Sequence, residues 1–358
     1  MDRDFYIDIA RSGRRLPIAT HLVLHESPDP EAILLDGPRL AGVMAEAASR
    51  FGNPLALPVM DLSLEKDFML AAMGIKGPAS FHFEGPPSPS QLAALAAADP
   101  LGRPRIAANC EALRVLSRDF AAGTGPAPVG MSIGPFSLLS KLLADPIVPV
   151  FLAGAGTSAE ESEEVALLEA LKPLCEDVVA TCCAAQIEAG AKAVFVCEPA
   201  ANGVFFSPIQ IEEGSSVFDD FVIGPNKRLK AFFDRRGVDL IFHDCGSLTT
   251  GMVASFAVLD PAIISLGSPV RLWEVEPFVP MRTVIYGNLP TKKFYSDEEV
   301  PLDALPGMVE EIDVRLEASG HPHIVGSECD VLAMEGREAA IMEKVEAFCS
   351  CRAGAAAR

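Results

Sequence analysis

The chain has 358 residues, of which 49% are hydrophobic and 22% charged, so it can bury a large core and is not disordered. Its 29 Lys and Arg against 49 Asp and Glu give a net charge of −20, which repels nucleic-acid phosphates and anionic lipids. No apolar leader opens the chain and no apolar stretch is long enough to span a bilayer. We therefore expect a cytoplasmic protein that binds neither nucleic acid nor membrane.

Amphipathic helical patterns alternate with short apolar runs that are rich in β-branched residues, which is typical of helices packed on buried strands. The clearest helix pattern begins at a Ser158–Glu161 capping box and ends at Gly190. The helical patterns cover residues 38–52, 106–122, 158–189, 227–237, 249–260, 305–320 and 335–350. The expected strands start near residues 55, 79, 128, 193, 238, 262, 283 and 323.

Eight buried strands that alternate with helices predict an α/β fold, and eight is the number that closes a (β/α)8 TIM barrel. Residues 51–358 would form the barrel and catalytic domain, and residues 1–50 an N-terminal extension or lid. An open, doubly wound sheet is the alternative. No G-x-G-x-x-G or P-loop follows any of these strands, which removes the usual nucleotide reasons for that alternative.

Potential metal ligands stand at the carboxyl ends of the expected strands, which is where barrel enzymes place their chemistry. His243 and Cys245 end one strand, and residues i and i+2 of an extended chain point the same way. Cys329 lies 84 residues later, on the last strand. The alternative is that all three are core residues, as we expect for most of the nine scattered cysteines.

One neutral imidazole and two thiolates select zinc among the common metals. Three protein ligands also leave one coordination position open for a substrate, whereas a structural zinc site more often has four. The pattern therefore predicts a catalytic zinc site formed by His243, Cys245 and Cys329.

The segments that carry these ligands, HDCG at 243–246 and GSECDV at 326–331, resemble the uroporphyrinogen decarboxylase superfamily. Within it they are similar to the zinc-dependent corrinoid methyltransferases of the methylcobalamin:coenzyme M type. The resemblance covers most of the chain from about residue 40. Further blocks that look like the family, in the family's order, are PVMDLSLEK at 58–66, SIGPFSLLSKL at 132–142, EAGAKAVFVCEPAA at 188–201, FSPIQIEE at 206–213 and YGNLP at 286–290.

The resemblance implies a methyl transfer between a corrinoid and a thiol that zinc activates. The corrinoid, methylcobalamin or a relative, would be carried by a separate corrinoid protein, because the chain has no Asp-x-His-x-x-Gly motif. The other substrate would be a small-molecule thiol, or a methylated compound if the transfer runs in reverse. A homodimer is left open.

The family blocks also contain the other candidate site residues. Asp61, Glu198 and Asn288 stand at expected strand ends and are the candidate catalytic residues, and Gly134 and Ser207 are the candidate cofactor-binding residues. The two acidic residues would take the thiol proton, orient a ligand or serve as a weak fourth zinc ligand. For the two acidic residues, a helix cap or a solvated carboxylate is the alternative.

The chain departs from the family where Cys329 lies in Gly-Ser-Glu-Cys-Asp, since the family usually has Gly-Cys there. Two other functions are therefore kept as alternatives. The first is a metal-free tetrapyrrole decarboxylase like uroporphyrinogen decarboxylase, and the second is a noncatalytic partner of a corrinoid protein.

Overall fold

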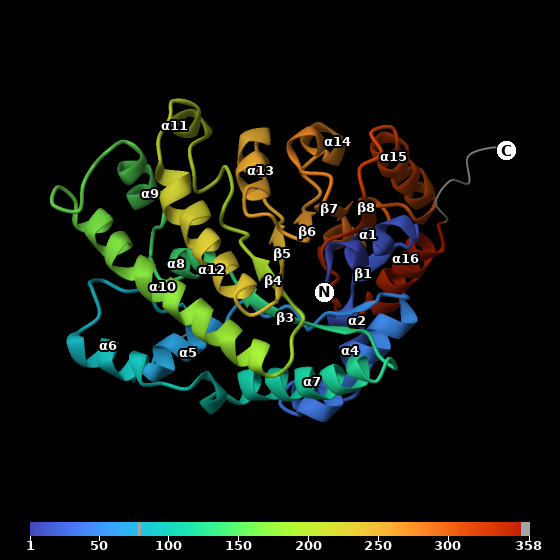
Figure 1. Cartoon of the computed structure of the whole chain (residues 1–358), viewed down its shortest axis with the longest axis horizontal. Helices are drawn as coiled ribbons and strands as arrows, with labels where there is room; N and C mark the ends of the chain where they lie inside the picture. Colours follow the sequence, from blue (N-terminus) through green and yellow to red (C-terminus); the bar gives the residue numbers. More distant parts are fainter. Residues whose placement is uncertain (78–79, 352–358) are drawn as a thin grey trace.

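A single sheet of eight parallel strands forms the centre of the computed structural model, which describes residues 1–77 and 80–351. Helices are ranged around these strands (Figure 1). The strand order is β1-β8-β7-β6-β5-β4-β3-β2, so almost every strand pairs with its neighbour in sequence. The strands are β1 (Leu16–Ile18), β2 (Leu55–Ala56), β3 (Ala127–Ile133), β4 (Ala193–Cys197), β5 (Asp239–Asp244), β6 (Ile263–Leu266), β7 (Val284–Leu289) and β8 (His323–Asp330).

The sheet curls around an apolar interior to which all eight strands contribute side chains. β4, with the sequence AVFVC, is buried along its whole length, because its alternate side chains face the interior and the surrounding helices. The two edges of the sheet are β1 and β2, and near them the Thr20 hydroxyl donates to the Leu57 carbonyl over 2.7 Å. The expected α/β class is therefore confirmed as a TIM-barrel-like sheet, called the barrel below.

The helices lie outside the barrel, and two of the longer ones, α4 and α7, pack against each other. The α-helices are α1 (Arg3–Arg11), α2 (Thr20–Leu24), α3 (Pro30–Ile33), α4 (Gly37–Arg50), α5 (Leu64–Ala72), α6 (Pro89–Ala96), α7 (Pro104–Ala121), α8 (Pro135–Ser140), α9 (Ile147–Gly154), α10 (Glu163–Glu188), α11 (Pro208–Glu212), α12 (Gly224–Asp234), α13 (Thr250–Ala257), α14 (Leu272–Val275), α15 (Leu305–Glu317) and α16 (Glu338–Ser350). Short 3-10 turns include η4 (Thr291–Lys293).

The longest helix, α10, begins four residues later than its predicted capping box. Ser162 is the N-cap and accepts from Val165 N, whereas Ser158 and Glu161 bond to each other in the preceding turn. At the other end Gly190 has φ +106°, a conformation that side chains disfavour, so the helix ends where the sequence predicted.

One of the eight strands differs from the prediction. Residues 80–85 form turns and irregular backbone, and residue 79 lies outside the described residues. The eighth strand is instead β1, which pairs with β8 and so places part of residues 1–50 inside the sheet. The expected N-terminal extension is therefore not confirmed, while the domain boundary at residue 50 stays a prediction.

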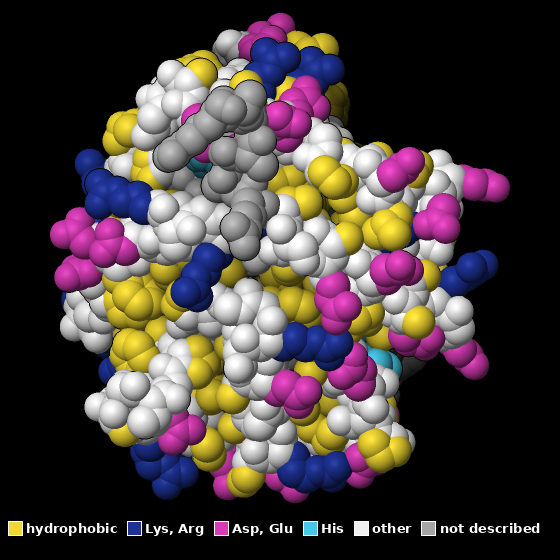
Figure 2. Space-filling view, turned by 90° about the vertical axis from the view of Figure 1, so that its right-hand side faces the viewer, with side chains coloured by type: hydrophobic (Ala, Val, Ile, Leu, Met, Phe, Trp, Pro, Cys, Tyr) yellow, Lys and Arg dark blue, Asp and Glu magenta, His cyan; other side chains and the backbone are white. Residues whose placement is uncertain are grey.

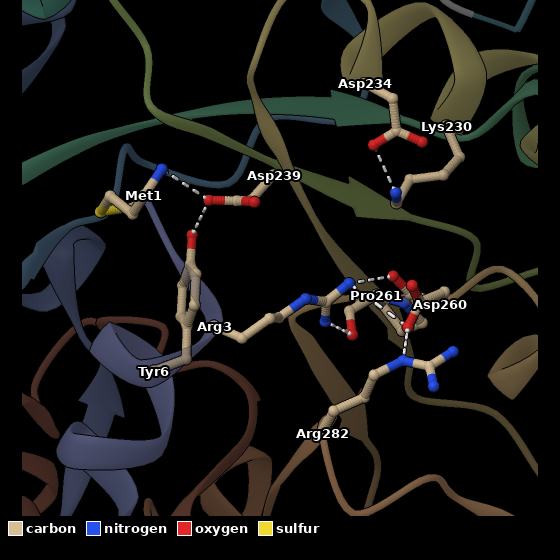
Figure 3. A network of polar contacts seen from close by, with 9 residues as sticks. All are labelled: Met1, Arg3, Tyr6, Lys230, Asp234, Asp239, Asp260, Pro261 and Arg282. Atoms are coloured by element: carbon tan, nitrogen blue, oxygen red, sulfur yellow. Dashed lines mark hydrogen bonds and ion pairs between the residues drawn. The ribbon is translucent and has the colours of Figure 1, made fainter.

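Helix α1 packs at the amino ends of the strands, opposite the end that holds the candidate site. Tyr6 and Ile9 join the apolar interior, and the Tyr6 hydroxyl donates to Asp239, the first residue of β5 (Figure 3). The guanidinium of Arg3 donates to the carbonyls of Asp260 and Pro261, just before β6. This helix therefore closes the bottom of the barrel and is not a lid over the site.

The surface carries charges of both signs, and Figure 2 shows Asp and Glu side chains interspersed with Lys and Arg on one face. Within residues 1–77 and 80–351, no helix combines the length and the apolar character that crossing a bilayer requires.

Candidate metal centre

His243, Cys245 and Cys329 converge at the carboxyl ends of β5 and β8. One ligand atom from each, the imidazole nitrogen and the two sulfurs, lies within 4.8 Å of both others. β5 and β8 are separated in the sheet by β6 and β7, so the curl of the barrel brings them together. In the described part of the chain, this is the one group of three or more His, Cys, Asp or Glu side chains placed to hold a metal.

The imidazole of His243 is held with one nitrogen free. His243 pairs in register with Ser265 of β6, and its Nδ1 lies 2.9 Å from the Ser265 hydroxyl. Its Nε2 is buried and has no hydrogen-bond partner. Burial of a polar atom without a partner costs about 1–3 kcal/mol. A metal ion bound to Nε2 would remove that cost.

The pKa values of the two cysteines are shifted in opposite directions. The Cys329 thiol lies against Cys245 and lowers the Cys245 pKa, an effect that His243 and the Lys292 ammonium reinforce. The same contact, together with burial, raises the Cys329 pKa. Lys292 comes from η4, after β7. Burial lowers the pKa of Lys292, but the charges of Cys245 and Cys329 outweigh that effect, so its pKa is raised overall. Cys245 is thus poised as a thiolate, the form that binds metal.

Close packing of backbone fixes the turn that carries Cys245. A Cβ on Gly246 would lie 2.7 Å from the Cβ of Asn202, and one on Gly267 would lie 2.6 Å from the Cα of Cys245. The Asp244 carboxylate accepts from Gly246 N over 2.6 Å, and burial raises its pKa. Both glycines are required because any side chain there would displace the ligand loop.

The two acidic residues predicted as catalytic bond to neighbouring protein groups. Asp61 accepts from the Ser63 hydroxyl over 2.6 Å and pairs with Arg105 over 3.0 Å. Glu198 is fully buried, and its oxygens accept from the backbone N–H groups of Phe136 and Ser137 at the start of α8. Burial raises the pKa of Glu198, whereas these bonds oppose that rise. Glu198 therefore anchors the α8 N-terminus, and the catalytic roles of both stay predictions.

Asn288 connects two neighbouring strand ends. Its Nδ2 donates to the carbonyls of Gly267, over 2.8 Å, and Val270, over 2.6 Å. Asn288 thus holds the loop after β6, which itself packs on Cys245. Its predicted catalytic role is not tested by these contacts.

The two predicted cofactor-binding residues stand at helix starts. Gly134 precedes α8, and a side chain there would overlap with the Glu198 carboxyl group. Ser207 is the N-cap of α11 and accepts from Gln210 N over 3.4 Å. Contacts with a cofactor stay predictions for both.

Residues 35–350 match the family model described as Uroporphyrinogen decarboxylase (URO-D). The chain belongs to the uroporphyrinogen decarboxylase family. A search of curated proteins found no match for this chain. Among solved structures, a methyltransferase from Methanosarcina mazei has a similar fold, with a TM-score of 0.66 and 17% sequence identity over 94% of this chain and 93% of that chain.

Three further residues of this uroporphyrinogen decarboxylase family member contact the candidate metal ligands and were not predicted. Ser265 orients His243, Lys292 faces Cys245, and the Met60 sulfur lies 3.7 Å from the Cys329 sulfur. Strand pairing would have indicated Ser265, since it is the register partner of His243. Met60 and Lys292 come from loops after β2 and β7, and no local pattern marks them.

Proposed function

We propose that this protein is a zinc-dependent methyltransferase that moves a methyl group between a methylcorrinoid on a partner protein and a thiol. The observation that carries the proposal is the buried, unpartnered Nε2 of His243 beside two cysteine sulfurs at the carboxyl end of the barrel. Family membership and the fold shared with a methyltransferase support the reaction class.

The donor atoms fit Zn²⁺, which binds imidazole nitrogen and thiolate sulfur and tolerates three protein ligands plus a substrate. Bound zinc would lower the pKa of a coordinated substrate thiol from its usual value of about 8.5, so that the thiol would be a thiolate at neutral pH. His243, Cys245 and Cys329 would hold the ion, and their two thiolates would balance its charge.

The surrounding side chains prepare the site for such a reaction. Ser265 holds the His243 ring through Nδ1, which leaves Nε2 free to bind a metal. The Lys292 ammonium favours the thiolate form of Cys245. Lys292 N donates to Glu328 over 3.2 Å, and Glu328 also accepts from the Ser268 hydroxyl over 2.6 Å. These bonds hold the loops after β6 and β7 at the edge of the site.

The test is methyl transfer by the purified full chain, with free methylcobalamin in place of the corrinoid protein and a panel of small thiols. We expect about one zinc per chain by elemental analysis, and loss of methylcobalamin absorbance that depends on both enzyme and thiol. Cys329→Ala should lose the metal and the transfer, whereas Cys197→Ala, a buried neighbour outside the ligand group, should keep both.

Three results would contradict the proposal. Wild type without zinc would remove the metal site, and a metal-free variant that transfers methyl as fast as wild type at pH 7 would remove the role of zinc. Decarboxylation of uroporphyrinogen by the metal-free protein would favour the decarboxylase alternative instead.

A further inference from the structure

Met60 brings a third sulfur to the ligand group from a different part of the barrel. It follows β2, four residues after Ala56, and its Sδ lies 3.7 Å from the Sγ of Cys329. Its backbone N–H donates to the Asp330 carboxylate over 3.4 Å, and its half-buried side chain packs against the apolar interior. The loop after β2 is thus held against the end of β8.

The spacing of the two sulfurs fits a shared tetrahedral ion. With zinc–sulfur bonds of about 2.3 Å, two sulfur ligands at the tetrahedral angle lie about 3.8 Å apart. The observed separation of Met60 Sδ and Cys329 Sγ is 3.7 Å. The thioether therefore needs no large movement to share an ion with Cys329.

The carboxylates near the site either bond to other protein groups or face away from the candidate ligands. Asp61 pairs with Arg105, and Glu198 accepts from the α8 backbone. Asp244 and Asp330 directly adjoin ligand residues on their strands, and consecutive strand side chains point to opposite faces. Within the described residues, no Asp or Glu joins the ligand group.

A thioether is chemically suited to a position that a substrate must take over. Two thiolates already balance the charge of Zn²⁺, so a carboxylate would make the centre anionic and weaken its attraction for an incoming thiolate. A thioether is soft, neutral and a weak donor. We propose that Met60 Sδ is the fourth ligand of the resting zinc site and that a substrate thiolate displaces it, an inference that rests on the zinc site proposed above.

The test is X-ray absorption at the zinc edge of the full chain, comparing wild type, Met60→Leu and Met131→Leu. Met131 is a methionine of the barrel interior outside the ligand group, so its variant is the matched control. We expect three sulfurs and one nitrogen around zinc in wild type and in Met131→Leu. In Met60→Leu we expect two sulfurs, with a light atom in the fourth position. Zinc affinity measured by chelator competition should fall about tenfold, the low end for loss of a supporting group at a metal site.

A second measurement needs no substitution. In wild type grown with selenomethionine, the zinc edge should show a selenium neighbour, and that neighbour should vanish when a small thiol is added. Two sulfurs in both wild type and Met60→Leu, with no selenium neighbour, would overturn the role of Met60 and leave the zinc site intact. Wild type that binds no zinc would overturn the proposed function itself, so the two failures are distinguishable.

Discussion

The polar groups at the two ends of the barrel differ in whether they are paired by hydrogen bonds within the protein. At the amino ends, Asp239 accepts from the Tyr6 hydroxyl over 2.9 Å and from the Met1 amino group over 3.0 Å (Figure 3). At the carboxyl ends, His243 Nε2 is buried without any partner, in the group that it forms with the sulfurs of Cys245 and Cys329. Buried polar atoms are normally paired, so an unpaired imidazole nitrogen beside two cysteine sulfurs is a candidate position for a ligand.

A second network at the amino ends also pairs its buried charged groups with one another. Arg15, just before β1, makes a bidentate pair with Asp313 of α15, one of whose bonds is 2.9 Å long. The same carboxylate lies 3.2 Å from the His323 ring at the start of β8. These groups join three elements that are far apart in sequence. The charged groups at the bottom of the barrel are thus paired within the protein, whereas the imidazole at the top keeps one nitrogen unpaired.

The comparison is tested most strongly by His243→Ala at the top. Removing the buried ring ends its Nδ1 contact with Ser265 but also relieves the unpaired Nε2, so we expect the metal-free protein to lose only about 1–3 kcal/mol of stability. Bound zinc and about 10²–10³-fold of methyl-transfer activity should be lost. Elemental analysis, activity and urea unfolding of chelator-treated protein measure the three effects. Zinc retained at one per chain would show that the imidazole is not a ligand.

The converse variant at the bottom is Arg15→Ala. Removing Arg15 leaves Asp313 buried beside His323 alone, and breaking a buried ion pair from one side costs about 3–5 kcal/mol. Urea unfolding should show this loss, while the folded fraction still binds zinc. Arg11→Ala, which removes an exposed partner of Asp8, is the control and should change little. Loss of zinc from folded Arg15→Ala would break the division between the two ends.

A buried carboxyl group near the top of the barrel, that of Glu65, should make the stability of the protein depend on pH. Burial raises the pKa of Glu65 from 4.5 to about 7, although the Ser132 hydroxyl, which donates over 2.6 Å, opposes the rise. Between these values the folded state holds a proton that the unfolded state has released, so stability falls as pH rises. The fall approaches about 3 kcal/mol in total.

Glu65→Gln should therefore be more stable than wild type at pH 8 and should lack this contribution at both pH values. Urea unfolding at pH 5 and pH 8 measures the difference. Ser132→Ala is the matched opposite change, because loss of the hydroxyl should raise the Glu65 pKa and so make the fall in stability between pH 5 and pH 8 larger than in wild type. Equal pH dependence in wild type and Glu65→Gln would contradict the assignment.

The smallest expected effect is that of Tyr6→Phe. The Tyr6 hydroxyl is one of two donors to Asp239, so the carboxylate keeps a partner and the loss should be about 1 kcal/mol. Thermal unfolding measures it, and Tyr295→Phe, at a more exposed tyrosine, is the control. A loss above about 3 kcal/mol would mean that the bottom network acts as one cooperative unit.

The sequence predicted those parts of the fold that local patterns encode. β4 is a run of β-branched and aromatic residues, so its burial could be read directly. β1 was missed because three residues, Leu-Pro-Ile, become a strand only by pairing with β8. Residues 80–85 looked like a strand, but Phe81 and Phe83 instead pack edge to face at 5.1 Å, and Phe83 N bonds to the Leu142 carbonyl outside any strand.

The candidate site divides in the same way. His243 and Cys245 could be paired because their spacing is local, and Cys329 because it ends another expected strand. Met60 and Lys292 reach the site from loops after β2 and β7, so only the folded barrel reveals them. Likewise, the α8 backbone that engages Glu198 lies some 60 residues before it in sequence.

The pairing of β1 with β8 has a consequence for how the chain folds during synthesis. Ile18 N donates to the Ser327 hydroxyl, 309 residues later, and Tyr286 donates to the Leu16 carbonyl across 270 residues. Contacts of such long sequence separation form slowly, because a large loop must close first. On the ribosome, β1 must wait until almost the whole chain has emerged. We expect its apolar residues to be the segment most exposed to chaperones and to aggregation before the nascent barrel is complete.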